Sequence, residues 1–143
     1  MIQISLVPQE SISLFWDDAC QHFERSFNYS PIFVDKDELL VDCLNGDLTL
    51  WVVYDETPDQ MIGAFTVRIK KYPGGTVLSG EHLGGSRLDE WADQLFDMMD
   101  QYAKLYNVSA LELIGRRGWE KILKPRGWTA ELVTFHRKVE SHV

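Results

Sequence analysis

The chain has 143 residues, of which 45% are hydrophobic and 12% aromatic, and it carries a formal net charge of −8. This length suits one domain, and the aromatic content excludes a natively disordered chain. No apolar run reaches the roughly 20 residues that cross a bilayer, and an acidic surface repels phosphate, so we expect neither a membrane nor a nucleic acid as partner. Residues 1–8 lack the basic and apolar regions of a secretory signal, which indicates a cytoplasmic protein.

The first half of the chain predicts a strand, two helices and an antiparallel meander. Apolar residues at three- and four-residue steps from Ile12 to Phe27 indicate one face of a helix, and Asp35 is a suitable cap for a second helix. Runs rich in β-branched residues, separated by turn residues, indicate strands. The predicted elements are a strand at 2–7, helices at 12–27 and 35–45, and strands at 48–54, 61–72 and 76–83.

The second half predicts a β-α-β crossover, a short helix and a closing strand. A continuous apolar stripe from Leu88 to Tyr106 indicates an amphipathic helix, with Ser86 and Asp89 as its capping box. The predicted elements are a helix at 88–106, a strand at 110–114, a basic helix at 116–124 and a closing strand at 128–139. A meander followed by a crossover requires a mixed sheet with helices on both faces. We therefore expect residues 1–143 to form one α+β domain with a mainly antiparallel central sheet and the order β-α-α-β-β-β-α-β-α-β.

The cysteines and charges restrict the chemistry further. Cys20 and Cys43 are isolated within helical apolar patterns, which indicates buried reduced thiols, and the His and Cys residues show no metal-ligand spacing. We therefore expect no metal. Residues 1–60 hold 12 acidic residues against two basic ones, whereas residues 110–143 hold seven basic against four acidic. The basic residues Arg116, Arg117, Lys121, Lys124 and Arg126 could contact phosphates or an acidic partner, or form the solvated face of a short helix.

The order of elements, together with residues 111–128, resembles the GNAT-type N-acetyltransferases. Gly127-Trp128 stands where that family has the Gly-aromatic pair that opens its sixth strand. The stretch Gly-Arg-Arg-Gly-Trp at 115–119 is also similar to small GNAT-like proteins encoded by bacteriophages, including internal virion components. The resemblance implies a GNAT-like fold and acetyl-CoA as the candidate cofactor.

In that family, a loop of the form Gln/Arg-x-x-Gly-x-Gly/Ala points backbone N–H groups and a helix N-terminus at the cofactor's pyrophosphate. The corresponding residues here are 81–86, so the resemblance implies cofactor contacts from Leu83, Gly84, Gly85, Ser86 and Arg87, with Arg116 where the family has an asparagine. Glu81 departs from the pattern, because a carboxylate stands where the family has Gln or Arg.

The general acid of the family is a tyrosine four residues before the Gly of the Gly-aromatic pair. That position is Leu123 here, which cannot donate a proton. A general base would have to be Glu81, His82 or Glu112, of which Glu112 lies on the strand beside the expected cofactor. Glu81 and Glu112 are therefore the candidate catalytic residues, and the usual catalytic set is incomplete.

Three functional hypotheses follow. The first is a GNAT-like protein that acts through binding a protein partner, as a phage accessory or virion component in the host cytoplasm or the virion. The second is an active acetyl-CoA-dependent N-acetyltransferase with a rearranged site, whose cationic amine acceptor suits the acidic N-terminal half. The third is an acidic inhibitor of a host nucleic-acid-binding protein. Because the acid at Leu123 is missing, the sequence favours the first.

Overall fold

The computed structural model describes residues 1–29, 35–57, 59–115, 117–135, 137 and 139. They form five strands and four α-helices, with short 3-10 turns before α1 and on either side of α4. The elements are β1 (Ile2–Leu6), α1 (Ile12–Tyr29), α2 (Lys36–Asn45), β2 (Thr49–Asp55), β3 (Gln60–Tyr72), β4 (Gly75–Gly85), α3 (Leu88–Leu105), β5 (Ala110–Leu113) and α4 (Glu120–Leu123).

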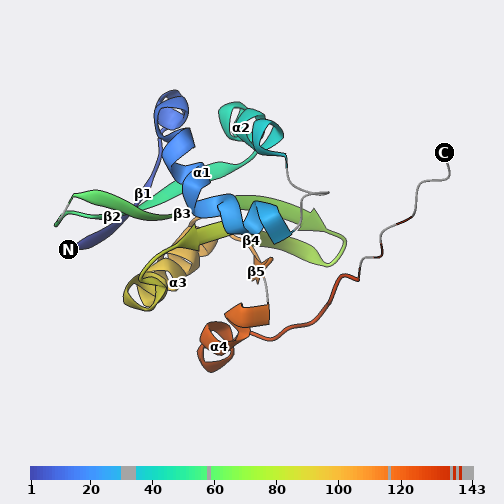
Figure 1. Ribbon diagram of the computed structural model, residues 1–143. Coiled ribbons are helices and arrows are strands. Elements are labelled where there is room, and N and C mark those ends of the chain that lie inside the picture. Colours follow the sequence, from blue (N-terminus) through green and yellow to red (C-terminus); the bar gives the residue numbers. More distant parts are fainter. Residues whose placement is uncertain (30–34, 58, 116, 136, 138, 140–143) are drawn as a thin grey trace.

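The five strands form one sheet in the order β1-β2-β3-β4-β5 (Figure 1). Neighbouring strands are antiparallel except for β4 and β5, which are parallel because α3 carries the chain back across the sheet between them. The predicted meander and the predicted mixed, mainly antiparallel sheet are therefore confirmed.

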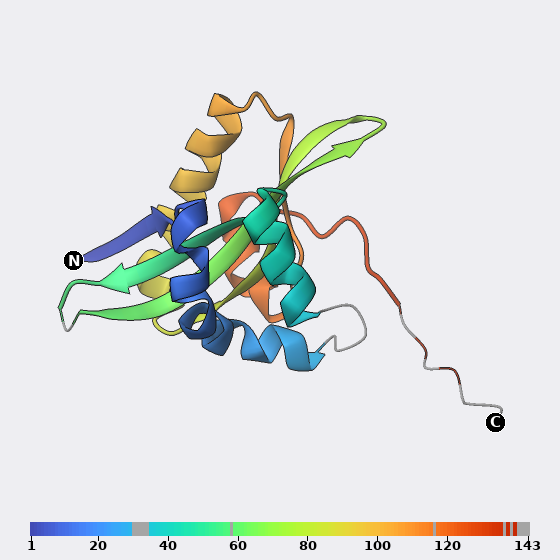
Figure 2. The same cartoon turned by 90° about the horizontal axis from the view of Figure 1, so that it is seen from above.

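Helices cover both faces of the sheet, with α1 and α2 on one face and α3 on the other (Figures 1 and 2). Successive side chains of a strand point to opposite faces, so β2 supplies both layers. Leu50 and Val52 pack with α1 and α2, whereas Trp51 and Val53 pack with α3. The face of α3 that was predicted to be buried includes Trp91, Leu95 and Met99, each almost completely covered.

The ends of α2 and the start of α3 at Leu88 are as predicted, but the residue that was expected to cap α3 is not. The Asp35 carboxylate accepts hydrogen bonds from the N–H groups of Asp37 (2.9 Å) and Glu38 (3.4 Å). The predicted capping box at Ser86 is wrong, since the residue before α3 is Arg87, in a left-handed conformation and without a side-chain cap. The reason is that β4 continues to Gly85, which places Ser86 one position too early to cap the helix.

The end of the chain departs most from the prediction. Instead of a helix at 116–124, the described residues form a 3-10 turn, the four-residue α4 and a second 3-10 turn, while Arg116 lies outside the described residues. The predicted closing strand at 128–139 is also wrong, because residues 128–135 and the other described positions of this range form no strand. An apolar alternating sequence needs a neighbouring backbone to become a strand, and the described part of the sheet ends at β5.

Cys20 and Cys43 are buried free thiols, as predicted. Burial raises the pKa of Cys20 to about 11 and that of Cys43 to about 12, so both remain protonated and unreactive. In the part of the chain that the structure describes, none of the helices has the length and apolarity to span a bilayer.

Candidate functional site

The turn between β4 and α3 is the place where the sequence predicts a cofactor loop. Most of this stretch is strand, because Leu83, Gly84 and Gly85 are in register with Phe65, Ala64 and Gly63 of β3. Only Ser86 and Arg87 separate the end of β4 from the start of α3. The strand that was predicted to end at residue 83 therefore continues to Gly85, and the connection to α3 is two residues long.

The two glycines of this turn lie against the protein's own backbone. A Cβ atom on Gly84 would collide with the carbonyl of His22 in α1. A Cβ on Gly85 would collide with the carbonyl of Ile62 in β3, and Gly85 also has a φ of +146°, a conformation that side chains disfavour. The missing side chains thus let α1 and β3 approach the turn closely. Leu83 is partly buried and packs with the residues beneath α3.

The backbone N–H of Ser86 and the guanidinium of Arg87 also have partners within the protein. Ser86 donates its backbone N–H to Ile62 (2.8 Å). Arg87 donates through Nη1 to Asp55 (2.6 Å) and, with Nε and Nη2, to both carboxylate oxygens of Glu90 (2.6 and 3.0 Å). One guanidinium therefore faces two carboxylates, and its positive charge is balanced locally.

Asp55 is the buried member of this group, with its side chain only 6% exposed. The hydrogen bond from Arg87 lowers the pKa of Asp55, and the backbone N–H of Thr57 lowers it further. Asp55 is therefore a carboxylate at neutral pH. This pairing could not be predicted from the sequence, because Asp55 ends β2 and lies 32 positions before Arg87.

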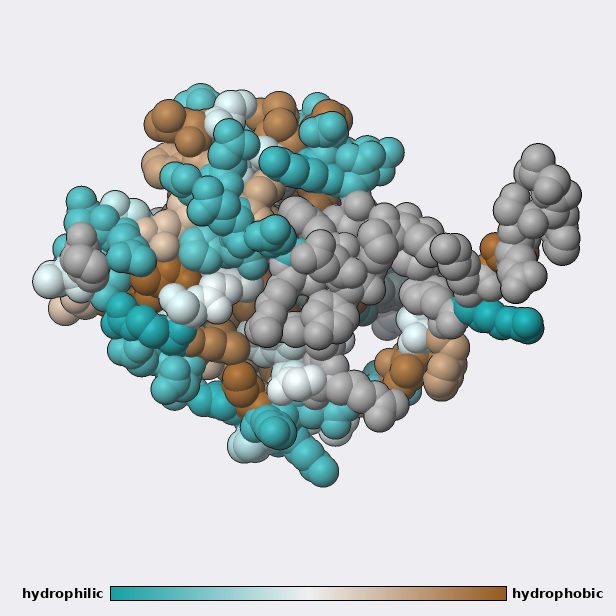
Figure 3. Space-filling view, in the orientation of Figure 1, coloured by the Kyte–Doolittle hydropathy of each residue, from teal (hydrophilic) through white to brown (hydrophobic). Residues whose placement is uncertain are grey.

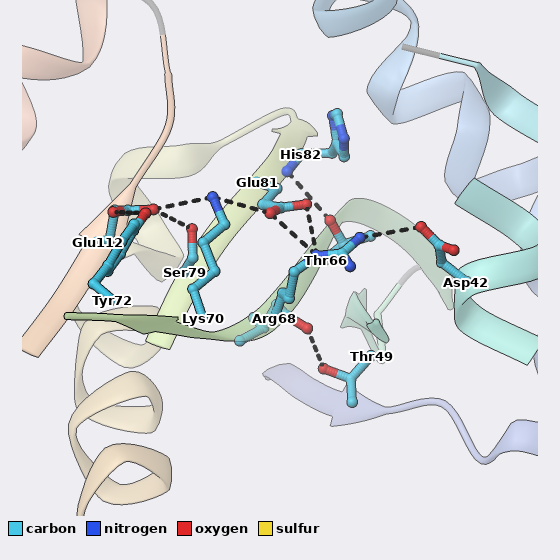
Figure 4. A network of polar contacts seen from close by, with 11 residues as sticks. Asp42, Thr49, Thr66, Arg68, Lys70, Tyr72, Ser79, Glu81, His82 and Glu112 are labelled. Carbon is cyan, nitrogen blue, oxygen red and sulfur yellow. Dashed lines mark hydrogen bonds and ion pairs between the residues drawn. The ribbon is translucent and has the colours of Figure 1, made fainter. Parts of the chain in front are cut away.

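A second polar arrangement crosses the sheet on the face that carries α2 (Figure 4). We call it the charged ladder; its members are Asp42, Arg68, Lys70, Glu81 and Glu112. Arg68 joins Asp42 of α2 (3.1 Å) to Glu81 of β4 (3.3 Å). Lys70 then joins Glu81 (3.3 Å) to Glu112 of β5 (3.2 Å). The ladder therefore brings the two predicted catalytic carboxylates together through one lysine.

Glu112 has two further partners, since Ser79 donates to it at 2.8 Å and the Tyr72 hydroxyl at 2.9 Å. Burial alone would raise the pKa of Glu112, but the hydrogen bonds from Ser79, Tyr72 and Lys70 outweigh it and hold the pKa below its usual range. A carboxylate with a lowered pKa is a weaker base. Sequence reasoning missed Lys70, although the alternation of Arg68, Lys70 and Tyr72 along β3 places all three on one face.

His82, the third predicted base, lies between the ladder and α1. Its backbone N–H donates to the Thr66 hydroxyl (3.2 Å), and its ring packs against Phe23 with the centroids 6.3 Å apart. Burial lowers the pKa of His82, so the neutral imidazole predominates at neutral pH. Of the three predicted bases, His82 is thus the one that is a neutral imidazole at neutral pH.

The short α4 is anchored to α3. Leu123, where the resembling family has its acidic tyrosine, is partly buried against the α3 core. Arg126 donates to Asp93 of α3 (2.7 Å) and to the Ile122 carbonyl (2.8 Å), and its guanidinium lies over the Phe96 ring at 5.7 Å. At least this member of the basic cluster therefore serves packing.

The remaining described lysines of the cluster line an open depression of about 420 Å³, which is formed by Glu120, Lys121, Lys124 and Pro125. The side chains of Arg116 and Arg117 lie outside the described residues. The described residues hold no group of three or more His, Cys, Asp or Glu that could bind a metal ion.

Solved structures of acetyltransferases share this arrangement of helices and strands. No family model and no curated protein matches the sequence. A predicted acetyltransferase of Clostridium acetobutylicum, solved with acetyl-CoA, matches the structure with a TM-score of 0.69 at 17% identity over 96% of each chain. A GCN5-related N-acetyltransferase of Ralstonia eutropha JMP134 matches with a TM-score of 0.73 at 12% identity, over 96% of this chain and 99% of that one.

An aminoglycoside acetyltransferase from an uncultured soil metagenomic sample, solved with sisomicin, matches with a TM-score of 0.68 at 12% identity over 97% of each chain. These likenesses cover almost the entire chain, so the protein has the GNAT fold, as the sequence predicted. At such identities they establish the fold and leave the activity to be argued from the residues.

Proposed function

We propose that this chain keeps the GNAT fold without the standard acetyl-CoA chemistry and acts by binding another protein. The observation that carries the proposal is the turn between β4 and α3, where Gly84, Gly85 and Ser86 are occupied by contacts with α1 and β3. A cofactor loop would leave glycines open and N–H groups directed at a phosphate. Here the glycines pack against α1 and β3, and the Ser86 N–H donates to a carbonyl of β3.

The charges around the turn do not fit a pyrophosphate. Arg87 is the cation nearest in sequence, and its guanidinium is already bound by Asp55 and Glu90. Asp89 and Glu90 occupy the first turn of α3, where their negative charge offsets the helix dipole that would attract an anion. A dianionic ligand at this place would meet more negative than positive charge, so we derive no reaction step through acetyl-CoA.

The groups that would move protons are also poorly suited to the task. Leu123 has no proton to donate to a departing thiolate. Glu81 and Glu112 are both held by Lys70, and a base in an ion pair must break it before accepting a proton. The side chains at these positions support the proposal that the usual catalytic set is incomplete.

An acidic outer face on α1 and α2 supports the protein-binding role. Its exposed acids are Asp17, Asp18, Glu24, Asp37 and Glu38, and the exposed Asp47 follows the end of α2. Such a surface favours a cationic partner and speeds association with it. The similarity of residues 115–119 to phage-encoded proteins adds the narrower proposal of a phage accessory or virion component, located in the host cytoplasm or the virion.

An active N-acetyltransferase with a rearranged site is the second candidate. A structure of the same fold was solved with acetyl-CoA, and another with the aminoglycoside sisomicin. The acidic face would suit a cationic amine acceptor, and the lowered pKa of His82 keeps its imidazole neutral at pH 7. This candidate requires acetyl-CoA to bind, so one measurement separates the two.

Isothermal titration calorimetry of the full chain with acetyl-CoA makes that separation. We expect no binding at millimolar acetyl-CoA for the wild type or for Arg87→Ala. Micromolar binding would contradict the proposal, and a loss of that binding in Arg87→Ala would establish the second candidate's phosphate site. Asp89→Asn is the matched control, because it changes one charge at the exposed start of α3 without removing the cation.

A further inference from the structure

The ammonium group of Lys70 lies between two carboxylates that come from different strands. Its nitrogen is 3.3 Å from Glu81 of β4 and 3.2 Å from Glu112 of β5. Figure 4 shows the three side chains pointing toward one another on one face of the sheet. An ammonium group has three N–H donors and a carboxylate only acceptors, so these contacts are charge-assisted hydrogen bonds.

Both carboxylates are also held by groups other than the lysine. Glu112 accepts hydrogen bonds from the Ser79 hydroxyl at 2.8 Å and from the Tyr72 hydroxyl at 2.9 Å. The Ser79 side chain is completely buried, which fixes its direction. Glu81 is held on its other side by Arg68, whose Nε lies 3.3 Å from it. The two carboxylates therefore keep their positions without help from the ammonium between them.

Lys70 differs from a lysine of the outer surface. Figure 3 shows hydrophilic residues over α1 and α2, where Lys36 pairs with Asp17 at 3.9 Å and the two side chains are 51% and 92% exposed. Such an exposed pair contributes little to stability. The Lys70 side chain is 23% exposed, and those of Glu81 and Glu112 are 14% and 30% exposed. This ammonium is therefore bound where water and salt screen it less.

The charged form of Lys70 is the form that these contacts favour. Burial alone would lower the pKa of Lys70, because it penalises the ammonium. The hydrogen bond with Glu112 and the charge of Glu81 outweigh burial and raise the pKa above its usual range. The two carboxylates thus stabilise an ammonium ion by more than its partial removal from water costs.

The ammonium of Lys70 is bound as a ligand would be, except that it is part of the chain. We infer that Glu81 and Glu112 form a binding site for a primary alkylammonium ion and that Lys70 fills this site in the wild-type chain. An amine from outside would therefore have to displace the lysine before it could reach either carboxylate. The site does not depend on whether acetyl-CoA binds, because it consists of contacts within the charged ladder.

Chemical rescue of a shortened side chain tests the site. Lys70→Ala removes the atoms beyond Cβ, and n-propylammonium replaces them one for one. We expect n-propylammonium chloride at about 0.2 M to raise the melting temperature of Lys70→Ala by about 2–4 °C more than sodium chloride does at the same concentration. Tetramethylammonium chloride has the charge but no N–H donors, so it should give no such rise. Adding Glu112→Gln to Lys70→Ala should reduce the rise.

Lys70→Met is the matched control, because it also loses the ammonium but keeps a side chain in the space that n-propylammonium needs. Lys71→Ala is a second control, since Lys71 is exposed on the opposite face of β3. Neither variant should respond to n-propylammonium more than to sodium chloride, and the wild type, whose site is filled, should not respond either.

A folded Lys70→Ala variant that shows no rise would overturn the inference. Equal rises with n-propylammonium and tetramethylammonium, or an equal rise in Lys70→Met, would overturn it too. If Lys70→Ala does not fold alone, the folded fraction after refolding from urea in each salt decides, measured by circular dichroism. Recovery in n-propylammonium only would support the site, and the same recovery in all three salts would contradict it.

Discussion

Gly84 lies where the backbone of α1 approaches β4 closely. Its hydrogen atom faces the carbonyl of His22, and no side chain could be accommodated without moving the helix. A glycine that makes room for a ligand and a glycine that makes room for the protein look the same in a sequence. A methyl group added by Gly→Ala would displace the ligand in the first case and the protein's own backbone in the second. Stability measurements can therefore distinguish the two cases.

We predict that Gly84→Ala lowers the free energy of unfolding by about 2–3 kcal/mol, because α1 must shift to admit the methyl group. Gly74→Ala is the control: nothing lies within 4 Å of its Cβ position, so its effect should be within about 0.5 kcal/mol. Urea denaturation measures both. Equal stabilities of the two variants would show that Gly84 faces open space.

Asp55 gives a prediction about pH. Its pKa in the folded protein is lowered from 3.8 by Arg87, so its contribution to stability is fully present above about pH 4 and is lost as the pH falls through the folded-state pKa. Asp55→Asn lacks this contribution at every pH. We therefore expect the difference in urea midpoint between wild type and Asp55→Asn to be largest near neutral pH and to shrink below about pH 4. A difference that stays constant down to pH 3 would refute the role given to Arg87.

For single residues, the sequence shows which side chains stand at the candidate site but not which groups they contact. The positions of Gly84, Gly85 and Ser86 and the replacement at Leu123 can be read directly from the chain. The contact between Arg87 and Asp55 cannot be read from the chain, because the two residues meet only when β2 and the start of α3 are brought together. Whether Arg87 can hold an anion depends on that contact.

At the scale of elements, the charged ladder ties four pieces of secondary structure together. It runs from α2 through β3 and β4 to β5, and Lys70 is its link between the two carboxylates on β4 and β5. The side chain of Lys70 is 23% exposed, so its ion pairs are partly shielded from water. Removing the lysine leaves Glu81 and Glu112 close together with one cation fewer.

We predict that Lys70→Met lowers the free energy of unfolding at pH 7 by on the order of 1–2 kcal/mol. The loss should shrink as the pH falls, because without Lys70 the pKa of Glu112 rises and its protonation relieves the unpaired charge. Lys71→Met is the matched control, since Lys71 is exposed on the opposite face of β3. If both variants lose the same stability at pH 7, the ladder does not stabilise the sheet.

Elements whose determinants are local were predicted best. The apolar stripe of α3 and the Asp35 cap of α2 depend on residues within a few positions, and both were confirmed. The closing strand at 128–139 was wrong because strand formation depends on a neighbour that the sequence does not specify. The capping box at Ser86 failed for a related reason: pairing with β3 extends β4 to Gly85.

Over the whole molecule, the GNAT fold persists at low sequence identity. The first of the compared structures is 17% identical to this chain. The fold requires two apolar layers on a twisted sheet, and many sequences meet that requirement. A cofactor site requires particular groups left free at one turn. The two demands are separable, which is why the fold could be predicted from the order of elements while the site needed the contacts of individual residues.

The proposed function depends on a turn from β4 to α3 that is closed by the protein's own contacts. Amide chemical shifts of Gly84, Gly85 and Ser86, followed by NMR during a titration with acetyl-CoA, test it directly. We predict that these three signals do not move at millimolar acetyl-CoA, because Gly84 and Gly85 lie against α1 and β3 and the Ser86 N–H is bound to Ile62. Shifts at Gly84 to Ser86 that saturate at micromolar acetyl-CoA would contradict it.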